Sequence, residues 1–206
     1  MITDDFEVEH GQLTFDAEGT EGGPNHSRKP HVPTDSSGVT IGRGYDLKER
    51  KKDDVIEDLT NAGMRMAEAE AYADGIGLKG KEARNFIKNN KDKLVDITPK
   101  QQKELFGFTY VDMEMDVKRI CGKDDVVAKY GKTNWPTLNA HIKEVVIDLR
   151  YRGDYSPLTR EKIQKHIADN NLTEFKKAML EEKYWVDERK VPGDRFKRRK
   201  EYLETS

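Results

Sequence analysis

The chain has 206 residues and a mass of 23.7 kDa, with 37% charged residues, 34% hydrophobic residues and a formal net charge of -2 at pH 7. This length fits one large domain or two joined lobes, and the single cysteine, Cys121, excludes a disulfide scaffold and a zinc ribbon. No apolar run approaches about 18 residues and residues 1–5 lack basic and apolar regions, so we expect no membrane insertion and no signal peptide.

Glycine, proline and serine are concentrated in residues 19–46, and their density there excludes a helix interior. We expect loops and a small antiparallel sheet of two or three strands that includes residues 38–45. The remainder of the chain has the apolar spacing of helices. These helices are expected at residues 51–62, 66–73, 81–93, 98–122, 135–153, 159–169, 173–182 and 194–203.

Two features of the helical part are especially clear. Thr98 and Gln101 form a capping box, which indicates the start of a helix. Residues 142–149 are the most apolar stretch, so we expect them at the centre of a helical lobe. The predicted fold class is α+β, mainly α, in a single domain. Its small N-terminal lobe would carry a β-hairpin and span about residues 1–97, and its larger C-terminal lobe would be helical and span about residues 98–206.

The residues able to carry chemistry lie between residues 15 and 50. Glu18 stands at a predicted helix end, and a hairpin that follows carries Thr40 and Asp46. One carboxyl group can protonate the leaving oxygen of an acetal while another activates water. Composition alone makes this a weak signal, because 39 of 206 residues are acidic. The alternative interpretation is that Glu18 is only a solvated carboxylate at a helix end and that residues 42–44 form only a hairpin turn.

Glu18-Gly19, followed after a loop by Gly38-Val39-Thr40-Ile41-Gly42-Arg43-Gly44-Tyr45-Asp46-Leu47, resembles the catalytic signature of the phage-type lysozymes, and most closely the pesticin-like muramidases. A weaker similarity continues at residues 148–153, at Trp185 and at residues 192–199. The resemblance implies a lysozyme-like fold and a bacteriolytic muramidase. Such an enzyme hydrolyses the β-1,4 bond between N-acetylmuramic acid and N-acetylglucosamine in bacterial peptidoglycan. It would act extracellularly or after delivery to the bacterial cell wall.

The resemblance assigns the catalytic roles residue by residue. Glu18 matches the general acid, Thr40 matches the threonine that positions water, and Asp46 matches the second carboxylate. Asp35, which precedes the threonine, is the alternative second carboxylate, and Glu21 competes with Glu18. The reaction would invert the anomeric centre if the carboxyl groups stand about 6.5 to 9.5 Å apart, and a separation near 5 Å would favour a covalent intermediate.

Other residues near the signature are candidates for substrate binding. We expect Asp35, His31, Arg43 and Tyr45 to contact the glycan in a cleft between the lobes. Arg150 could reach a substrate carboxylate, although an ion pair within the fold is the commoner use of such an arginine. No metal and no organic cofactor are implied, because an acid, a base and water suffice for this reaction.

Two rival functions stay open. A catalytically inactive peptidoglycan-binding protein would keep the fold without turnover. A nucleic-acid-binding module would use the basic residues 189–200, but the net charge is near neutral and no stacking aromatic residues accompany a basic groove, so we expect no nucleic-acid partner. We instead expect residues 195–200 to form a solvated helix face, and the protein to be a monomer. An immunity protein or a delivery partner is possible, and the sequence does not identify either.

Overall fold

The computed structural model describes residues 5–23 and 26–205 and divides the chain into two compact units. The first unit contains the N-terminal residues up to Glu9 and the segment Glu18–Thr109, and the second contains His10–Ala17 and the chain from Tyr110 onward. The division therefore falls inside a helix rather than near residue 97. The first helix of the chain also belongs with the C-terminal residues, which sequence spacing alone did not indicate.

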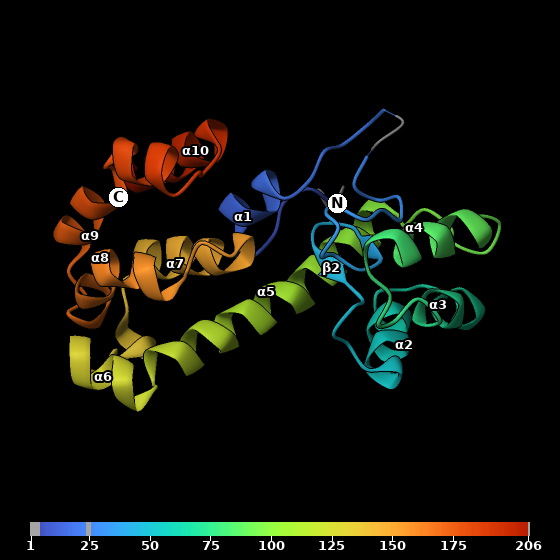
Figure 1. Cartoon of the computed structure of the whole chain (residues 1–206), viewed down its shortest axis with the longest axis horizontal. Helices are drawn as coiled ribbons and strands as arrows, with labels where there is room; N and C mark the ends of the chain where they lie inside the picture. Colours follow the sequence, from blue (N-terminus) through green and yellow to red (C-terminus); the bar gives the residue numbers. More distant parts are fainter. Residues whose placement is uncertain (1–4, 24–25, 206) are drawn as a thin grey trace. The chain divides into compact units, whose positions relative to one another are not determined.

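The first unit contains a hairpin followed by helices. Its elements are β1 (Thr40–Ile41), β2 (Tyr45–Asp46), α2 (Lys52–Asn61), α3 (Met66–Ala73), α4 (Gly80–Asn89) and the N-terminal part of α5 (Pro99–Cys121) (Figure 1). The capping box at the start of α5 is confirmed, because the Thr98 amide donates to Gln101 Oε1 at 2.8 Å and the Gln101 amide donates to Thr98 Oγ1 at 3.1 Å.

The two strands are antiparallel and pair Thr40 with Asp46 and Ile41 with Tyr45. The small predicted sheet is thus confirmed, and an isolated bridge adds His31 beside Thr40. The apolar side chains of the hairpin lie in the core of the first unit, where they pack with residues of α2, α3 and α5. Burial of this side of the hairpin fixes its register, because a one-residue slip would turn the apolar side chains to water.

All regular elements among the described residues of the second unit are helices. Its elements are α1 (Gln12–Ala17), the remainder of α5, α6 (Asp124–Tyr130), η1 (Trp135–Thr137), α7 (Ala140–Arg152), α8 (Pro157–Ala168), α9 (Leu172–Met179), the π-helical turn η2 (Lys183–Glu188) and α10 (Gly193–Glu204). The prediction of a mainly helical α+β chain is confirmed.

Helix α7 is the centre of the second unit, as the apolar run predicted. Ile142, Val145, Val146 and Leu149 are fully buried, and the helix contacts α1, α9 and α10. The predicted start at Trp135 is wrong, however. A 3-10 turn forms there, and α7 begins after Asn139, whose side chain accepts hydrogen bonds from the first turn of the helix. Such N-capping satisfies amides that have no partner within the helix.

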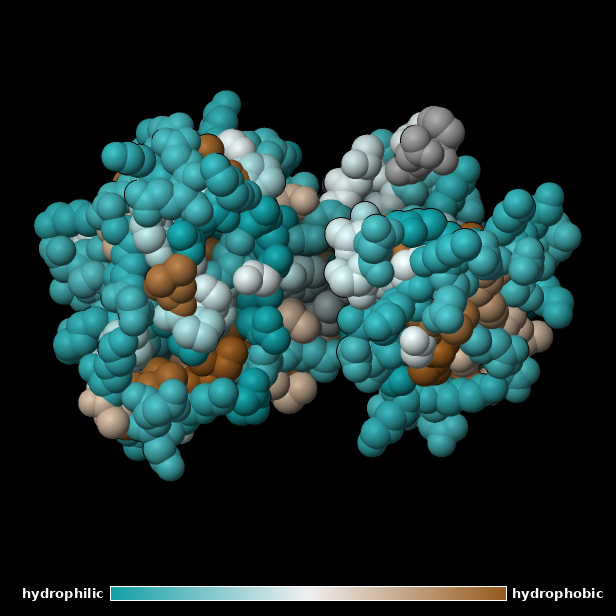
Figure 2. All heavy atoms as spheres, viewed as in Figure 1, coloured by the Kyte–Doolittle hydropathy of each residue, from teal (hydrophilic) through white to brown (hydrophobic). Residues whose placement is uncertain are grey.

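The face drawn in Figure 2 is mostly hydrophilic, and its hydrophobic side chains form small separate groups. Within the described residues, no helix combines the length and the apolar character that crossing a membrane requires.

Candidate functional site

The hairpin turn places two of the predicted catalytic residues opposite each other. Because Thr40 pairs directly with Asp46, their side chains leave the same face of the hairpin. Gly42 and Gly44 flank the tip with φ angles of 59° and 92°, which glycine adopts without the steric cost of a Cβ atom. A Cβ at Gly42 would also lie 3.2 Å from Ile97 Cδ1, so the turn packs closely on the first unit's core.

The carboxylate of Asp46 is held by the main chain around it. Oδ2 accepts the Gly38 amide at 3.0 Å, and Oδ1 accepts the Lys48 amide at 2.8 Å. Thr40 is 3% exposed, and its hydroxyl donates to the Gly38 carbonyl at 3.3 Å. A carboxylate has about four lone-pair directions, so Asp46 keeps capacity to accept a proton or a hydrogen bond from water while the two amides fix its position.

Glu18 comes directly after α1, and its side chain is partly exposed. The next residue, Gly19, lies against the hairpin turn, since a Cβ there would be 2.8 Å from both Cγ and Nε of Arg43. It would also be 2.9 Å from Ser27 Oγ. The Glu18-Gly19 main chain and the turn between the strands therefore lie together within the first unit.

Glu21 is the centre of a polar cluster in the first unit. Arg43 Nη2 donates to its Oε1 at 2.9 Å, Arg28 Nε to its Oε2 at 3.3 Å, and the buried Gln102 donates to it through Nε2. Burial by itself raises the pKa of Glu21, but the hydrogen bonds from Gln102 and the two arginines outweigh it and hold the pKa below its ordinary value. Glu21 is therefore deprotonated at neutral pH, which disfavours it as the general acid.

Tyr45 lies in the core rather than on the surface of the first unit. Its side chain is fully buried, its hydroxyl donates to Asp58 Oδ2 at 2.6 Å, and the guanidinium of Arg50 stacks 4.0 Å from the ring centroid. Tyr45 consequently offers no surface to a glycan in this structure. Its position suits it to holding the hairpin.

His31 and Asp35 lie on the chain that leads into the hairpin. The main chain of His31 exchanges hydrogen bonds of 2.8 and 2.9 Å with Thr40, and its Nδ1 lies 2.8 Å from the Lys29 carbonyl. The Asp35 side chain is 93% exposed and pairs with Arg84 at 2.8 Å. Of the two candidates for the second carboxylate, Asp46 is the one that the strand register sets opposite Thr40.

Arg150 belongs to the second unit, where its Nε donates to Asp116 Oδ2. The ion pair within the fold that we weighed as the alternative use of Arg150 is thus present. Arg152 likewise pairs with Asp154. The partner of Arg150 is on α5, 34 residues earlier in the chain, and sequence spacing did not indicate it.

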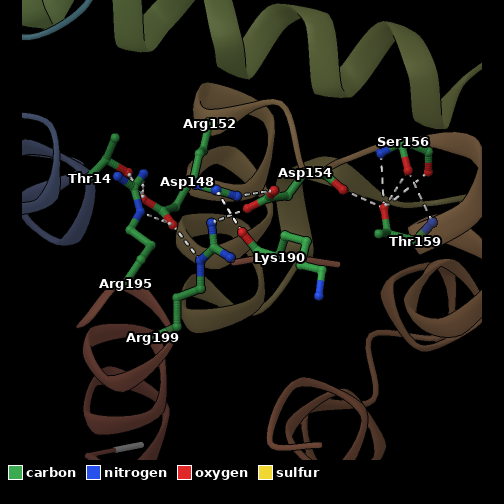
Figure 3. A network of polar contacts seen from close by, with 9 residues as sticks. All are labelled: Thr14, Asp148, Arg152, Asp154, Ser156, Thr159, Lys190, Arg195 and Arg199. Atoms are coloured by element: carbon green, nitrogen blue, oxygen red, sulfur yellow. Dashed lines mark hydrogen bonds and ion pairs between the residues drawn. The ribbon is translucent and has the colours of Figure 1, made fainter. Parts of the chain in front are cut away.

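A buried network of charges joins α7 to α1 and α10 (Figure 3). Asp148 accepts hydrogen bonds from Thr14, Arg195 and Arg199, and Arg199 also donates to Asp154 at 2.9 Å. The prediction of a solvated face at residues 195–200 is wrong for Arg195 and Arg199, which are 5% and 2% exposed. Their burial is possible because the aspartates supply the opposite charge.

Sequence reasoning missed the partners of Glu21 and recognised only the carboxylate. Gln102 lies 81 residues away and is fully buried on the inward face of α5. A buried glutamine at an otherwise apolar position is a signal for such a partner, because a buried amide requires hydrogen bonds. Among the described residues, no group of three or more His, Cys, Asp and Glu side chains is arranged to hold a metal ion.

Residues 11–200 match the profile of a protein family described as a domain of unknown function, DUF8812. The match covers more than half of the chain, so the chain belongs to this family. A comparison with curated proteins found no match.

Proposed function

We propose that this member of the DUF8812 family is a muramidase with a lysozyme-like fold that hydrolyses the β-1,4 bond between N-acetylmuramic acid and N-acetylglucosamine in peptidoglycan. One observation carries the proposal. The hairpin pairs Thr40 with Asp46, and the same unit packs the Glu18-Gly19 main chain against the turn of that hairpin. These are the three residues that the resemblance to the pesticin-like muramidases selects.

In this mechanism Glu18 is the general acid and protonates the glycosidic oxygen as the bond breaks. The cluster around Glu21 keeps that carboxyl deprotonated, which argues against Glu21 as the acid. Glu21 also accepts hydrogen bonds from three side chains, which restrict the movement of its carboxylate.

Asp46 and Thr40 act on the water that attacks the anomeric carbon. The two main-chain amides keep Asp46 fixed, and its remaining lone pairs accept from the water and then take its proton. Inversion follows if the two carboxyl groups are about 6.5 to 9.5 Å apart with substrate bound, and proton NMR of the first anomer formed would report the outcome. The action of the enzyme on the cell wall, from outside the cytoplasm or after delivery, is part of the proposal.

The proposal is tested by incubating the folded protein with purified peptidoglycan and identifying the soluble fragments by mass spectrometry. Muropeptides with reducing N-acetylmuramic acid ends are expected. Reducing N-acetylglucosamine ends would place the cleavage at the other glycosidic bond, and 1,6-anhydro ends would exclude water as the attacking group. Sedimentation with peptidoglycan but no release of fragments would support a catalytically inactive binding protein instead.

A further inference from the structure

We propose that the second unit contains a binding site for a small carboxylate with an apolar body, in a cavity between the end of α5, helix α6 and η1. The cavity has a volume of about 250 Å³, and its walls include Lys118, Cys121, Val127, Thr133 and Trp135. This site is separate from the residues proposed for glycan hydrolysis, so neither proposal depends on the other.

The walls of the cavity fit a small apolar group. Trp135 and Val127 supply apolar surface, and the ring of Trp135 is held by a hydrogen bond of 2.9 Å from its Nε1 to Glu114 Oε1. Cys121 forms part of the cavity wall and we assign it no polar contact with a ligand, because its Sγ already lies 3.3 Å from the Tyr155 hydroxyl and accepts a hydrogen bond from Gln164 at 3.4 Å. Sites for drug-sized ligands are about 300 to 1,000 Å³ and a cavity of about 150 Å³ can hold benzene, so this one fits a benzoate-sized molecule.

The charges around Trp135 favour an anion. Lys118 and Lys132 line the cavity, and the ammonium groups of Lys118 and Lys143 lie 5.7 and 5.5 Å from the centroid of the Trp135 ring. Glu114 pairs with Lys118 at 2.9 Å and balances one of these three charges. The surroundings therefore keep a positive excess that a carboxylate would neutralise.

Thr133 supplies a neutral hydrogen-bond donor. Its Oγ1 is buried and has no hydrogen-bond partner among the described residues, although the residue lines the cavity. Burial of a hydroxyl without a partner costs free energy, and a carboxylate oxygen is a strong acceptor for such a group. Because Oγ1 itself is buried, it reaches a ligand in the cavity only if the Thr133 side chain rotates, and a carboxylate would then satisfy a donor that the protein leaves unsatisfied.

The test is calorimetric titration of the whole protein with benzoate, with benzamide as the neutral ligand of similar shape and with inorganic phosphate as an anion without an apolar body. We expect benzoate to bind at least tenfold more tightly than either. Equal affinity for benzamide would show that the lysine charges do not contribute to binding. Equal affinity for phosphate would reduce the site to a basic surface, and no benzoate binding would refute the proposal outright.

Two variants test the roles of Lys132 and Thr133, and Lys197→Ala, at an exposed residue of α10, is the control for a lost charge. Lys132→Ala and Thr133→Val should each weaken benzoate binding at least threefold, and the control should not. Thr133→Val should also keep or raise the melting temperature, because valine has a similar shape and removes the unsatisfied hydroxyl. A lower melting temperature would mean that the hydroxyl already has a partner in the protein, and wild-type affinity in this variant would likewise contradict the site.

Discussion

Asp148→Asn should strongly destabilise the second unit. Asp148 is fully buried and its carboxylate faces the guanidinium groups of Arg195 and Arg199. The amide of asparagine removes the negative charge and one of the two acceptor atoms, while Asp154 still pairs with Arg199. Removal of one partner from a buried ion pair costs about 3 to 5 kcal/mol, so a loss of this size in the free energy of unfolding is expected.

Urea denaturation of the wild type and the variant measures this loss. For a chain of this size it corresponds to a fall of about 6 to 20 °C in the melting temperature. Asp169→Asn is the matched control, because its carboxylate forms an exposed pair with Lys165 that should contribute less than about 1 kcal/mol. A loss below about 1 kcal/mol in Asp148→Asn would refute the view that this charge is essential to the network.

The same network predicts that the stability of the protein depends on pH in the acid range. Burial by itself raises the pKa of Asp148, but the guanidinium groups of Arg199 and Arg195 outweigh it and hold the pKa below its ordinary value. The stabilisation from this group is therefore present above the pKa of the unfolded chain and is lost as the pH falls through the lower pKa of the folded protein. Asp148→Asn should lose less stability than the wild type over that acid range, and parallel losses would contradict this account.

Glu21→Gln should lower the free energy of unfolding, measured in urea, by about 0.5 to 1.5 kcal/mol, because hydrogen bonds to a charged, partly exposed group are weakened. Peptidoglycan clearing by this variant should fall by less than tenfold. A hundredfold fall would identify Glu21 as the general acid. Gly19→Ala should lower the free energy of unfolding by about 1 to 3 kcal/mol and slow clearing, because the new Cβ would lie 2.8 Å from Arg43. Gly107→Ala is the control, because a Cβ there meets nothing within 4 Å. Equal stability of the two variants would show that the turn can accommodate a Cβ. Asp46→Asn should reduce clearing about 100-fold with little change in glycan binding, and unchanged clearing would exclude Asp46 as the base.

The sequence was sufficient to predict the elements whose signals are local. The capping box at Thr98, the apolar run in α7 and the glycine-flanked turn between the strands each depend on neighbouring residues alone, and each is present in the structure. Helix α6 and the π-helical turn η2 were not predicted, because each is a single short segment without a clear apolar period.

The errors concern polar residues whose partners are far away in the chain. In the sequence, Arg195 and Arg199 belong to a basic run that is expected to be solvated. In the structure both donate hydrogen bonds to the buried Asp148, which lies 47 and 51 residues away in the chain. The composition gives the number of charged residues in α10 but does not indicate which of them pair with a buried carboxylate. Tyr45 was expected at the substrate, but its side chain is fully buried and its hydroxyl donates to Asp58, 13 residues away in the following helix.

The most direct test of the proposed function is the rate of peptidoglycan clearing by Glu18→Gln beside the wild type and Glu49→Gln. Glutamine nearly preserves the shape of Glu18 but cannot donate the proton, and Glu49 is an 85% exposed glutamate near the hairpin, so it controls for loss of a charge. The proposal predicts a loss of about 100-fold or more for Glu18→Gln with an unchanged melting temperature, and an unchanged rate for Glu49→Gln. Clearing by folded Glu18→Gln at the wild-type rate would contradict the proposed acid and the mechanism built on it.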